Sequence, residues 1–168
     1  ISSKIEKHFN HILISIFLLG ALLRLYRLGY KSLWFDEIST LDDAKIASYL
    51  FWTKTHALYF ALVRFFLRFG QTEFWLRFVS FLFGALGPVA IYFAGREIYK
   101  DKRVGLLAAL FTATSLIHLI FSQEARYYSA IFFFSAFALF LYARFINRFC
   151  IVSLCLLPVV CYANYLIH

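Results

Sequence analysis

Five long apolar stretches, separated by short groups of charged residues, constrain the fold of this sequence more than any other feature. They occupy residues 12–28, 78–94, 104–121, 130–143 and 149–167. A helix needs about 20 mostly apolar residues to cross a bilayer, with about 17 as the lower limit. The fourth stretch reaches this length only if Tyr127 and Tyr128 extend it as interfacial anchors. Because 62% of the residues are hydrophobic and only 15% are charged, we predict an all-α bundle of about five membrane spans.

Basic residues near the ends of these stretches predict the topology. They form three groups, which are Lys4 with Lys7, Arg96 with Lys100, Lys102 and Arg103, and Arg144 with Arg148. Cytoplasmic connections of membrane proteins are enriched in Lys and Arg. If all three groups are cytoplasmic, segments 29–77 and 122–128 lie on the outer side. The apolar segment 57–69 is short and contains Arg64 and Arg68, so we expect an interfacial amphipathic helix there, although a further span is the alternative.

Several other classes of protein are excluded or disfavoured. The net charge of +8 does not indicate nucleic-acid binding, because the basic residues are dispersed and form neither an arginine-rich arm nor a zinc-finger spacing. The three cysteines lie in the last apolar stretch without a C-x-x-C pair, so no zinc site or disulfide is indicated. Glycine-rich phosphate loops and hydrolase motifs are missing as well. Since the sequence opens with Ile1, has no Met and ends in or just after an apolar stretch, we expect it to be a piece of a longer protein.

The first candidate site lies in the predicted outer segment, where Asp36 and Glu37 follow two aromatic residues. A helix beginning near Ser32 would place Asp36, either Ser39 or Thr40, and Asp43 on one face. Trp34 and Phe35 would lie at the headgroup boundary, leaving the carboxylates beside the membrane surface. A partly desolvated carboxylate there could act as a general base. Alternatively, the acidic residues only stabilise the helix N-terminus.

The second candidate site is the short turn between the third and fourth stretches. It contains Glu124, Arg126 and Tyr127. Charged residues this close to lipid either line a functional site or cap the helices and solvate the turn. His56, which precedes the predicted amphipathic helix, is either structural or a ligand-binding residue.

Taken together, these segments resemble the GT-C fold glycosyltransferases. The similarity is to the bacterial branch related to dolichyl-phosphate-mannose protein mannosyltransferases and aminoarabinose lipid A transferases. The matching segments occur in order at residues 23–26, 32–37, 56–60, 69–80, 92–96 and 122–128. The resemblance implies that residues 1–168 form the N-terminal part of a membrane glycosyltransferase domain, with an outer catalytic loop at about 29–77.

The resemblance also implies an activity and a location. Such enzymes transfer a sugar from a polyprenyl-phosphate donor to a hydroxyl of a lipid, glycan or protein acceptor. They act on the outer, periplasmic face of the inner membrane. The acid of the family's first loop corresponds to Asp36, which would be the general base. Its neighbour Glu37 would support Asp36 or help to hold a divalent metal, if one is used.

Other residues would then bind the substrates. Arg77, Glu124 and Arg126 would contact the donor phosphate or the acceptor, with Tyr127 beside them and Arg64 as a further cation. His56 is a weaker candidate, because two prolines that often follow the family's histidine are replaced here by Ala57 and Leu58. The alternatives from other classes are a component of a membrane transporter or flippase, and a truncated remnant without activity.

Overall fold

The computed structural model describes residues 2–46 and 56–167, and this part of the chain is helical without strands. The helices are α1 (Ser2–Leu25), α2 (Phe35–Ile46), α3 (Ala57–Phe66), α4 (Glu73–Tyr99), α5 (Lys102–Thr114), α6 (Leu116–Ser122), α7 (Tyr128–Arg148) and α8 (Ile151–Ile167). The predicted all-α class is therefore confirmed. Helix α2 begins at Phe35, three residues later than the sequence suggested.

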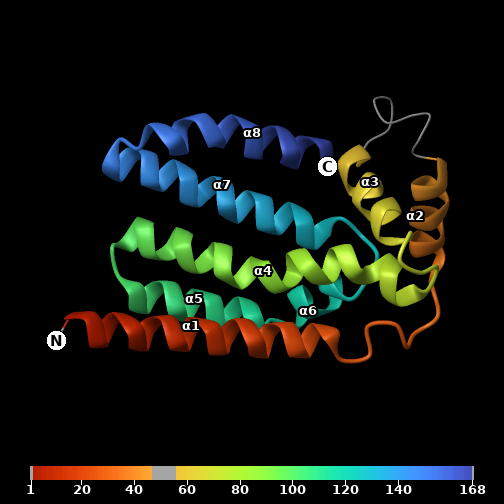
Figure 1. The fold of residues 1–168 in the computed structure, drawn as a ribbon, viewed down its shortest axis with the longest axis horizontal. Helices are drawn as coiled ribbons and strands as arrows, with labels where there is room; N and C mark the ends of the chain where they lie inside the picture. The colour runs from red at the N-terminus through yellow and green to blue at the C-terminus, as the bar shows by residue number, and fades with distance from the viewer. Residues whose placement is uncertain (1, 47–55, 168) are drawn as a thin grey trace.

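The long helices lie side by side along the long axis of the molecule, and α2 and α3 cross one end of the bundle (Figure 1). Helix α4 is central and packs against α1, α3, α5, α6 and α7. Helix α8 packs against α7 and α3. We call the end formed by α2, α3 and the α6–α7 turn the loop end, and the end where α4 connects to α5 the basic end.

Three helices are long and apolar enough to cross a membrane, and they contain His8–Leu25, Glu73–Tyr99 and Tyr128–Arg148. The last of these shows that Tyr128 does extend the fourth apolar stretch. The third stretch is not one straight span, because α5 and α6 meet at an angle of 61°. Helix α8 has 17 residues, which is the lower limit for a span, so a fifth crossing stays a prediction.

The connections alternate between the two ends as the basic residues predicted. The start of α1, the α4–α5 connection and the α7–α8 connection lie at the basic end, whereas segments 26–34 and 123–127 lie at the loop end (Figure 1). Large apolar side chains project from the flanks, and Leu22, Phe111 and Ile117 are 64%, 73% and 68% exposed. This surface suits lipid contact, since water would not solvate so many apolar groups favourably.

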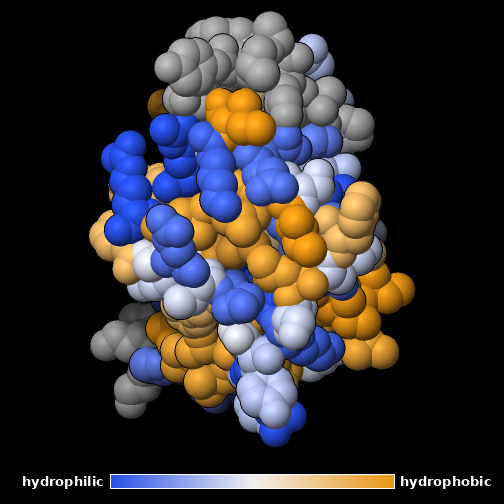
Figure 2. Space-filling view, turned by 90° about the vertical axis from the view of Figure 1, so that its right-hand side faces the viewer, coloured by the Kyte–Doolittle hydropathy of each residue, from blue (hydrophilic) through white to orange (hydrophobic). Residues whose placement is uncertain are grey.

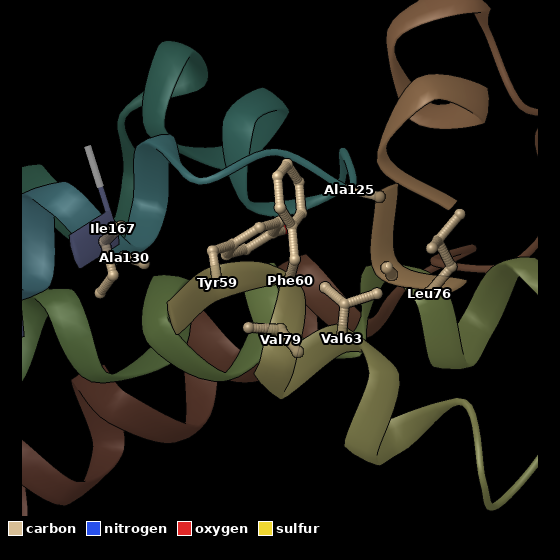
Figure 3. Packing of buried hydrophobic residues seen from close by; sticks show 9 residues of the cluster. Tyr59, Phe60, Val63, Leu76, Val79, Ala125, Ala130 and Ile167 are labelled. Atoms are coloured by element: carbon tan, nitrogen blue, oxygen red, sulfur yellow. The ribbon is translucent and has the colours of Figure 1, made fainter. Parts of the chain in front are cut away.

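A buried apolar cluster fixes α3 across the loop end. Tyr59, Phe60 and Val63 of α3 are at most 6% exposed and contact Leu76 and Val79 of α4 (Figure 3). Helix α3 therefore buries one face against the bundle, and Arg64 lies half-buried beside that face. This arrangement agrees with an amphipathic helix that lies across the ends of the spans.

The break between α5 and α6 is stabilised by a buried arginine of α1. A helix end leaves backbone carbonyls without intrahelical donors. Arg24 donates to the carbonyls of Ala113 (3.1 Å) and Thr112 (3.2 Å), and to Ser122 Oγ (3.2 Å). Its Nη2 also lies 2.7 Å from Nδ1 of His118. Since these atoms come from both sides of the break, the guanidinium holds the two short helices in their bent arrangement.

Candidate active site

A buried ion pair joins the two elements that the sequence singled out at the loop end. Glu37 lies in the first turn of α2, and Arg77 lies near the start of α4. Arg77 donates from Nε to Oε1 and from Nη2 to Oε2 of Glu37, each at 2.7 Å. The two side chains are 4% and 1% exposed. The backbone N–H of Ala125 also donates to Glu37 Oε1 at 2.7 Å, so one carboxylate connects α2, α4 and the α6–α7 turn.

The remaining donors of Arg77 hold the connection between α1 and α2. Its Nη1 donates to the carbonyls of Leu28 (3.0 Å) and Lys31 (2.9 Å), and its Nη2 donates to that of Ser32 (3.2 Å). All five guanidinium N–H groups therefore have acceptors. Arg77 and Glu37 are occupied by contacts that set the shape of the site, and neither offers an unused group to a substrate.

Asp36 has the opposite environment although it is the adjacent residue. Its side chain is 38% exposed, and its Oδ2 lies 3.9 Å from Nη2 of Arg126. The face of α2 that turns inward carries Glu37, Thr40 and Ala44, which leaves Asp36 at the edge of that face. The carboxylate is thus accessible to a bound molecule and close to a cation.

Arg126 is held beside Asp36 by aromatic rings and by its own backbone. Its guanidinium carbon lies 5.1 Å from the ring centroid of Tyr127 and 5.8 Å from that of Tyr128. The hydroxyl of Ser80 donates to the Arg126 carbonyl at 2.8 Å. The side chain is 18% exposed, and its Nε is a buried atom without a hydrogen-bond partner. A buried donor without an acceptor is unfavourable, but this atom is enclosed, so only the exposed part of the guanidinium is open to an incoming anion.

His56 contacts the same group of residues. Its ring stacks on that of Tyr127 at a centroid distance of 3.8 Å and an interplanar angle of 13°. Its Nδ1 donates to the carbonyl of Ile167 at 2.8 Å, and its backbone has a left-handed φ of 64° at the start of α3. The structure therefore brings Asp36, Arg126, Tyr127 and His56 together, with His56 joining α3 to α7 and α8.

Glu124 lies on the other side of the buried ion pair. It lines a cavity of about 400 Å³ together with Arg27, Lys31, Glu37 and Arg77. Burial, and then the negative charge of Glu37, raise the pKa of the Glu124 carboxyl above its usual range. Figure 2 looks onto this end of the molecule and shows hydrophilic and apolar side chains interleaved on it.

Arg64 is not part of either group. It lines a separate hollow between α2 and α3, of about 410 Å³, with Lys45, Arg68 and Gln71. Of the residues proposed from the sequence, Arg64 is thus the one that the structure places apart from Asp36 and Glu124.

Sequence reasoning missed two polar residues that hold α6 and the turn after it. One is Arg24, which holds the break between α5 and α6 as described above. The other is Gln123, whose Nε2 donates to the carbonyls of Tyr26 (2.9 Å) and Arg24 (3.1 Å) at the end of α1. Both lie in segments already noted for their resemblance, at 23–26 and 122–128, but their roles depend on contacts about 100 residues apart in the chain.

The residues near Asp36 do not form a typical divalent metal site. Both oxygens of Glu37 accept hydrogen bonds from Arg77, and Asp36 faces the cation Arg126. Within the part of the chain that the structure describes, no three His, Cys, Asp or Glu residues are grouped so as to hold a metal ion. A carboxylate that is already neutralised by a guanidinium is a poor ligand for Mg²⁺ or Ca²⁺, which require several oxygen ligands.

Comparison with known proteins identifies the family. A family model described as dolichyl-phosphate-mannose-protein mannosyltransferase matches residues 54–165. The chain belongs to this family. No curated protein and no solved structure matches it significantly. Membership makes the chain a membrane glycosyltransferase of the mannosyltransferase type. His56, Arg77, Glu124, Arg126 and Tyr127 lie inside the matched range, and segment 32–37, which carries Asp36 and Glu37, precedes it.

Proposed function

We propose that the loop end is the catalytic site for sugar transfer from a polyprenyl-phosphate donor to an acceptor hydroxyl, with Asp36 as the general base. One observation carries this proposal. Two adjacent carboxylates have different environments, since Glu37 is fully buried and bonded on both oxygens, whereas Asp36 is 38% exposed beside Arg126. Different environments for two neighbouring carboxylates are typical of a site in which one carboxylate takes part in the reaction and the other holds the structure.

The chemistry requires a base and a cation at the same place. As the acceptor oxygen forms its bond to the anomeric carbon, its proton passes to the Asp36 carboxylate. The bond between that carbon and the phosphate oxygen breaks, and the lipid phosphate leaves with the electron pair. Arg126 lies beside Asp36, and part of its side chain is exposed, so it is placed to bind the phosphate. Charge-assisted hydrogen bonds from a guanidinium stabilise a leaving phosphate strongly.

The other residues hold this geometry. The Glu37–Arg77 pair fixes the start of α2 relative to the α6–α7 turn, so Asp36 and Arg126 keep their separation. His56 supports Tyr127 by stacking, and Tyr127 lies against the Arg126 guanidinium. Glu124 lines the neighbouring cavity beside the Glu37–Arg77 pair. The mechanism needs no divalent cation, because Arg126 supplies the positive charge.

The proposal includes a location and a stereochemical course. The loop end would face the periplasm from the inner membrane, because the sequence resembles the bacterial branch with the aminoarabinose transferases. The charge rule gives this orientation less support, since the loop end carries basic residues of its own, among them Lys31, Arg64 and Arg68. A single displacement without a covalent enzyme intermediate inverts the anomeric carbon. Products with the configuration of the donor linkage would contradict that course.

The proposal is tested by a transfer assay with the complete protein in membranes. Labelled polyprenyl-phosphate sugars and the matching nucleotide sugars are supplied separately, to wild type and to Asp36→Asn. We expect transfer only from the lipid-linked donors, and a loss of about 10²–10⁴-fold in the variant. Arg64→Gln is the matched control, because Arg64 lines a different hollow, and it should retain transfer. Transfer from nucleotide sugars, or transfer that survives in Asp36→Asn, would contradict the proposal.

A further inference from the structure

The hollow between α2 and α3 lies at the loop end but outside the proposed catalytic site. The two helices are neighbours across that end of the bundle (Figure 1). The hollow has a volume of about 410 Å³, and its described lining includes Lys45 of α2, Arg64 of α3 and Arg68 just after α3. Gln71 adds a side-chain amide to it. We call it the α2–α3 hollow.

No carboxylate balances these three basic side chains inside the α2–α3 hollow. The described lining residues include neither Asp nor Glu, and the connecting segment 47–55 contains neither. Asp42 and Asp43 belong to α2 but do not line the hollow. Within residues 2–46 and 56–167, none of the three basic side chains forms an ion pair. The hollow is therefore a region of unbalanced positive charge.

Helix dipoles explain these basic residues one at a time but not their convergence. Lys45 and Arg64 lie in the last turns of α2 and α3, where the dipole favours a cation. Arg68 lies beyond the end of α3 at Phe66, yet it lines the same hollow. Like charges that line one hollow repel each other, and an anion bound between them would interact favourably with all three.

Exposed aromatic rings beside the hollow indicate that it lies at the level of the membrane interface. Phe65 and Phe69, which directly follow the two arginines, are 49% and 61% exposed. The Phe69 ring lies 5.5 Å from that of Phe65 and 5.6 Å from that of Trp75, measured between centroids. Aromatic side chains beside basic residues are typical of the headgroup region. An anion in the hollow is thus more readily supplied by a lipid than by the aqueous phase.

We propose that the α2–α3 hollow binds the phosphate-bearing headgroup of an anionic lipid from the leaflet at the loop end. Lys45, Arg64 and Arg68 contact the phosphate, and the acyl chains lie against the exposed rings of Phe65 and Phe69. Basic pockets between helices bind anionic headgroups, and guanidinium groups form strong charge-assisted hydrogen bonds to phosphate. This lipid is not a substrate of the proposed reaction, since neither Asp36 nor Arg126 lines the hollow.

The test measures lipid binding to the complete protein purified in detergent. Phosphatidylglycerol, phosphatidylcholine with the same acyl chains, and inorganic phosphate are titrated separately. Native mass spectrometry counts the bound lipid, and the thermal midpoint is followed in parallel. The variants are Lys45→Gln and Arg68→Gln, which change one exposed side chain on each wall of the hollow. The matched control is Arg27→Gln, because Arg27 is exposed at the same end and does not line the hollow.

We expect phosphatidylglycerol to bind and to raise the thermal midpoint, and phosphatidylcholine and inorganic phosphate to do neither. Each variant should weaken this binding about fivefold, because one basic residue near an anionic lipid contributes about that factor. Arg27→Gln should leave it unchanged.

Three results would each overturn the proposal. Equal binding of the two lipids would show that the headgroup charge is not recognised, and an equal effect of inorganic phosphate would show that no lipid is needed. A loss in Arg27→Gln as large as in the variants, or a loss in only one of the two variants, would show that the hollow between the helices is not the site. The sugar-transfer assay is not involved, so this result is independent of the proposed reaction.

Discussion

Both ends of the bundle pair a buried glutamate with an arginine, but the two pairs have different environments. At the loop end, the side chains of Arg77 and Glu37 are 4% and 1% exposed. At the basic end, Arg148 is 56% exposed and Glu97 is 5% exposed. The Arg77 guanidinium uses all its N–H donors inside the protein, whereas the Arg148 side chain remains largely exposed.

This difference shows what each ion pair does. A buried pair contributes little net stability compared with apolar residues, because desolvation offsets the attraction, but removing one partner leaves a buried charge unpaired. The Glu37–Arg77 pair therefore specifies one arrangement of α2, α4 and the α6–α7 turn. The Glu97–Arg148 pair holds the end of α7 against α4, with its arginine largely exposed.

The largest difference in stability is expected between the variants Arg77→Gln and Arg148→Gln. Arg77→Gln should lower the free energy of unfolding by about 3–5 kcal/mol, because it leaves Glu37 buried without its counter-charge. Arg148→Gln should lower it by less than Arg77→Gln does, since Arg148 is 56% exposed and its attraction to Glu97 is already screened by the surroundings. Unfolding of the purified proteins in detergent measures both. Equal losses would contradict the contrast between the two ends.

A second large effect is expected at the break between α5 and α6. Arg24→Gln removes charged hydrogen bonds to the carbonyls of Thr112 and Ala113 and should lower the free energy of unfolding by about 2–3 kcal/mol. Arg27→Gln is the control, because Arg27 is exposed and lies beside the rings of Tyr26 and Tyr30. A loss in the control as large as that in Arg24→Gln would show that the buried network does not hold the bend.

Two glycines of α4, Gly84 and Gly95, are expected to differ in how well they tolerate an added methyl group. A Cβ at Gly84 would collide with Oγ and Cβ of Ser122, whereas a Cβ at Gly95 would meet the Cα of Gly105 at 3.4 Å, at ordinary contact distance. Overpacking of this kind reduces stability by about 1–3 kcal/mol. Gly84→Ala should therefore lower the thermal midpoint more than Gly95→Ala. The reverse order would contradict the packing of α6 against α4.

The smallest effect is expected at Glu124 and depends on pH. Burial raises its pKa, so the folded state binds this proton more tightly than the unfolded state does. Folding is then penalised as the pH rises above the pKa of the unfolded chain, and the penalty is lost in acid. Glu124→Gln should thus raise the thermal midpoint slightly at pH 7 and leave it unchanged near pH 4. A lower midpoint of the variant at pH 7, with no difference in acid, would show that the pKa is lowered instead.

The sequence predicted the membrane class and the positions of most helices, because the length of an apolar stretch and its flanking charges are local properties. It also placed Asp36, Glu37, Glu124 and Arg126 at one end of the bundle. It could not show which of the two adjacent carboxylates is buried. That depends on Arg77 and on the backbone of Ala125, which are 40 and 88 residues away from Glu37.

Two further features could not be predicted from the sequence, for similar reasons. The third apolar stretch is continuous in composition, and its break at Ser115 depends on Arg24 as a donor from another helix. Arg64 is basic and close in sequence to His56, but the helix that separates them turns Arg64 toward a different hollow. Apolar periodicity predicts helices, and only the tertiary arrangement determines which polar side chains meet.

The most direct test of the account compares Asp36→Asn with Glu37→Gln in the complete protein, measuring the rate of sugar transfer and the thermal midpoint for each. If Asp36 performs the chemistry and Glu37 holds the geometry, Asp36→Asn should lose about 10²–10⁴-fold in rate with an unchanged midpoint. Glu37→Gln should lose stability and transfer together. An active Asp36→Asn enzyme, or a Glu37→Gln enzyme that is inactive with a native midpoint, would contradict the assignment.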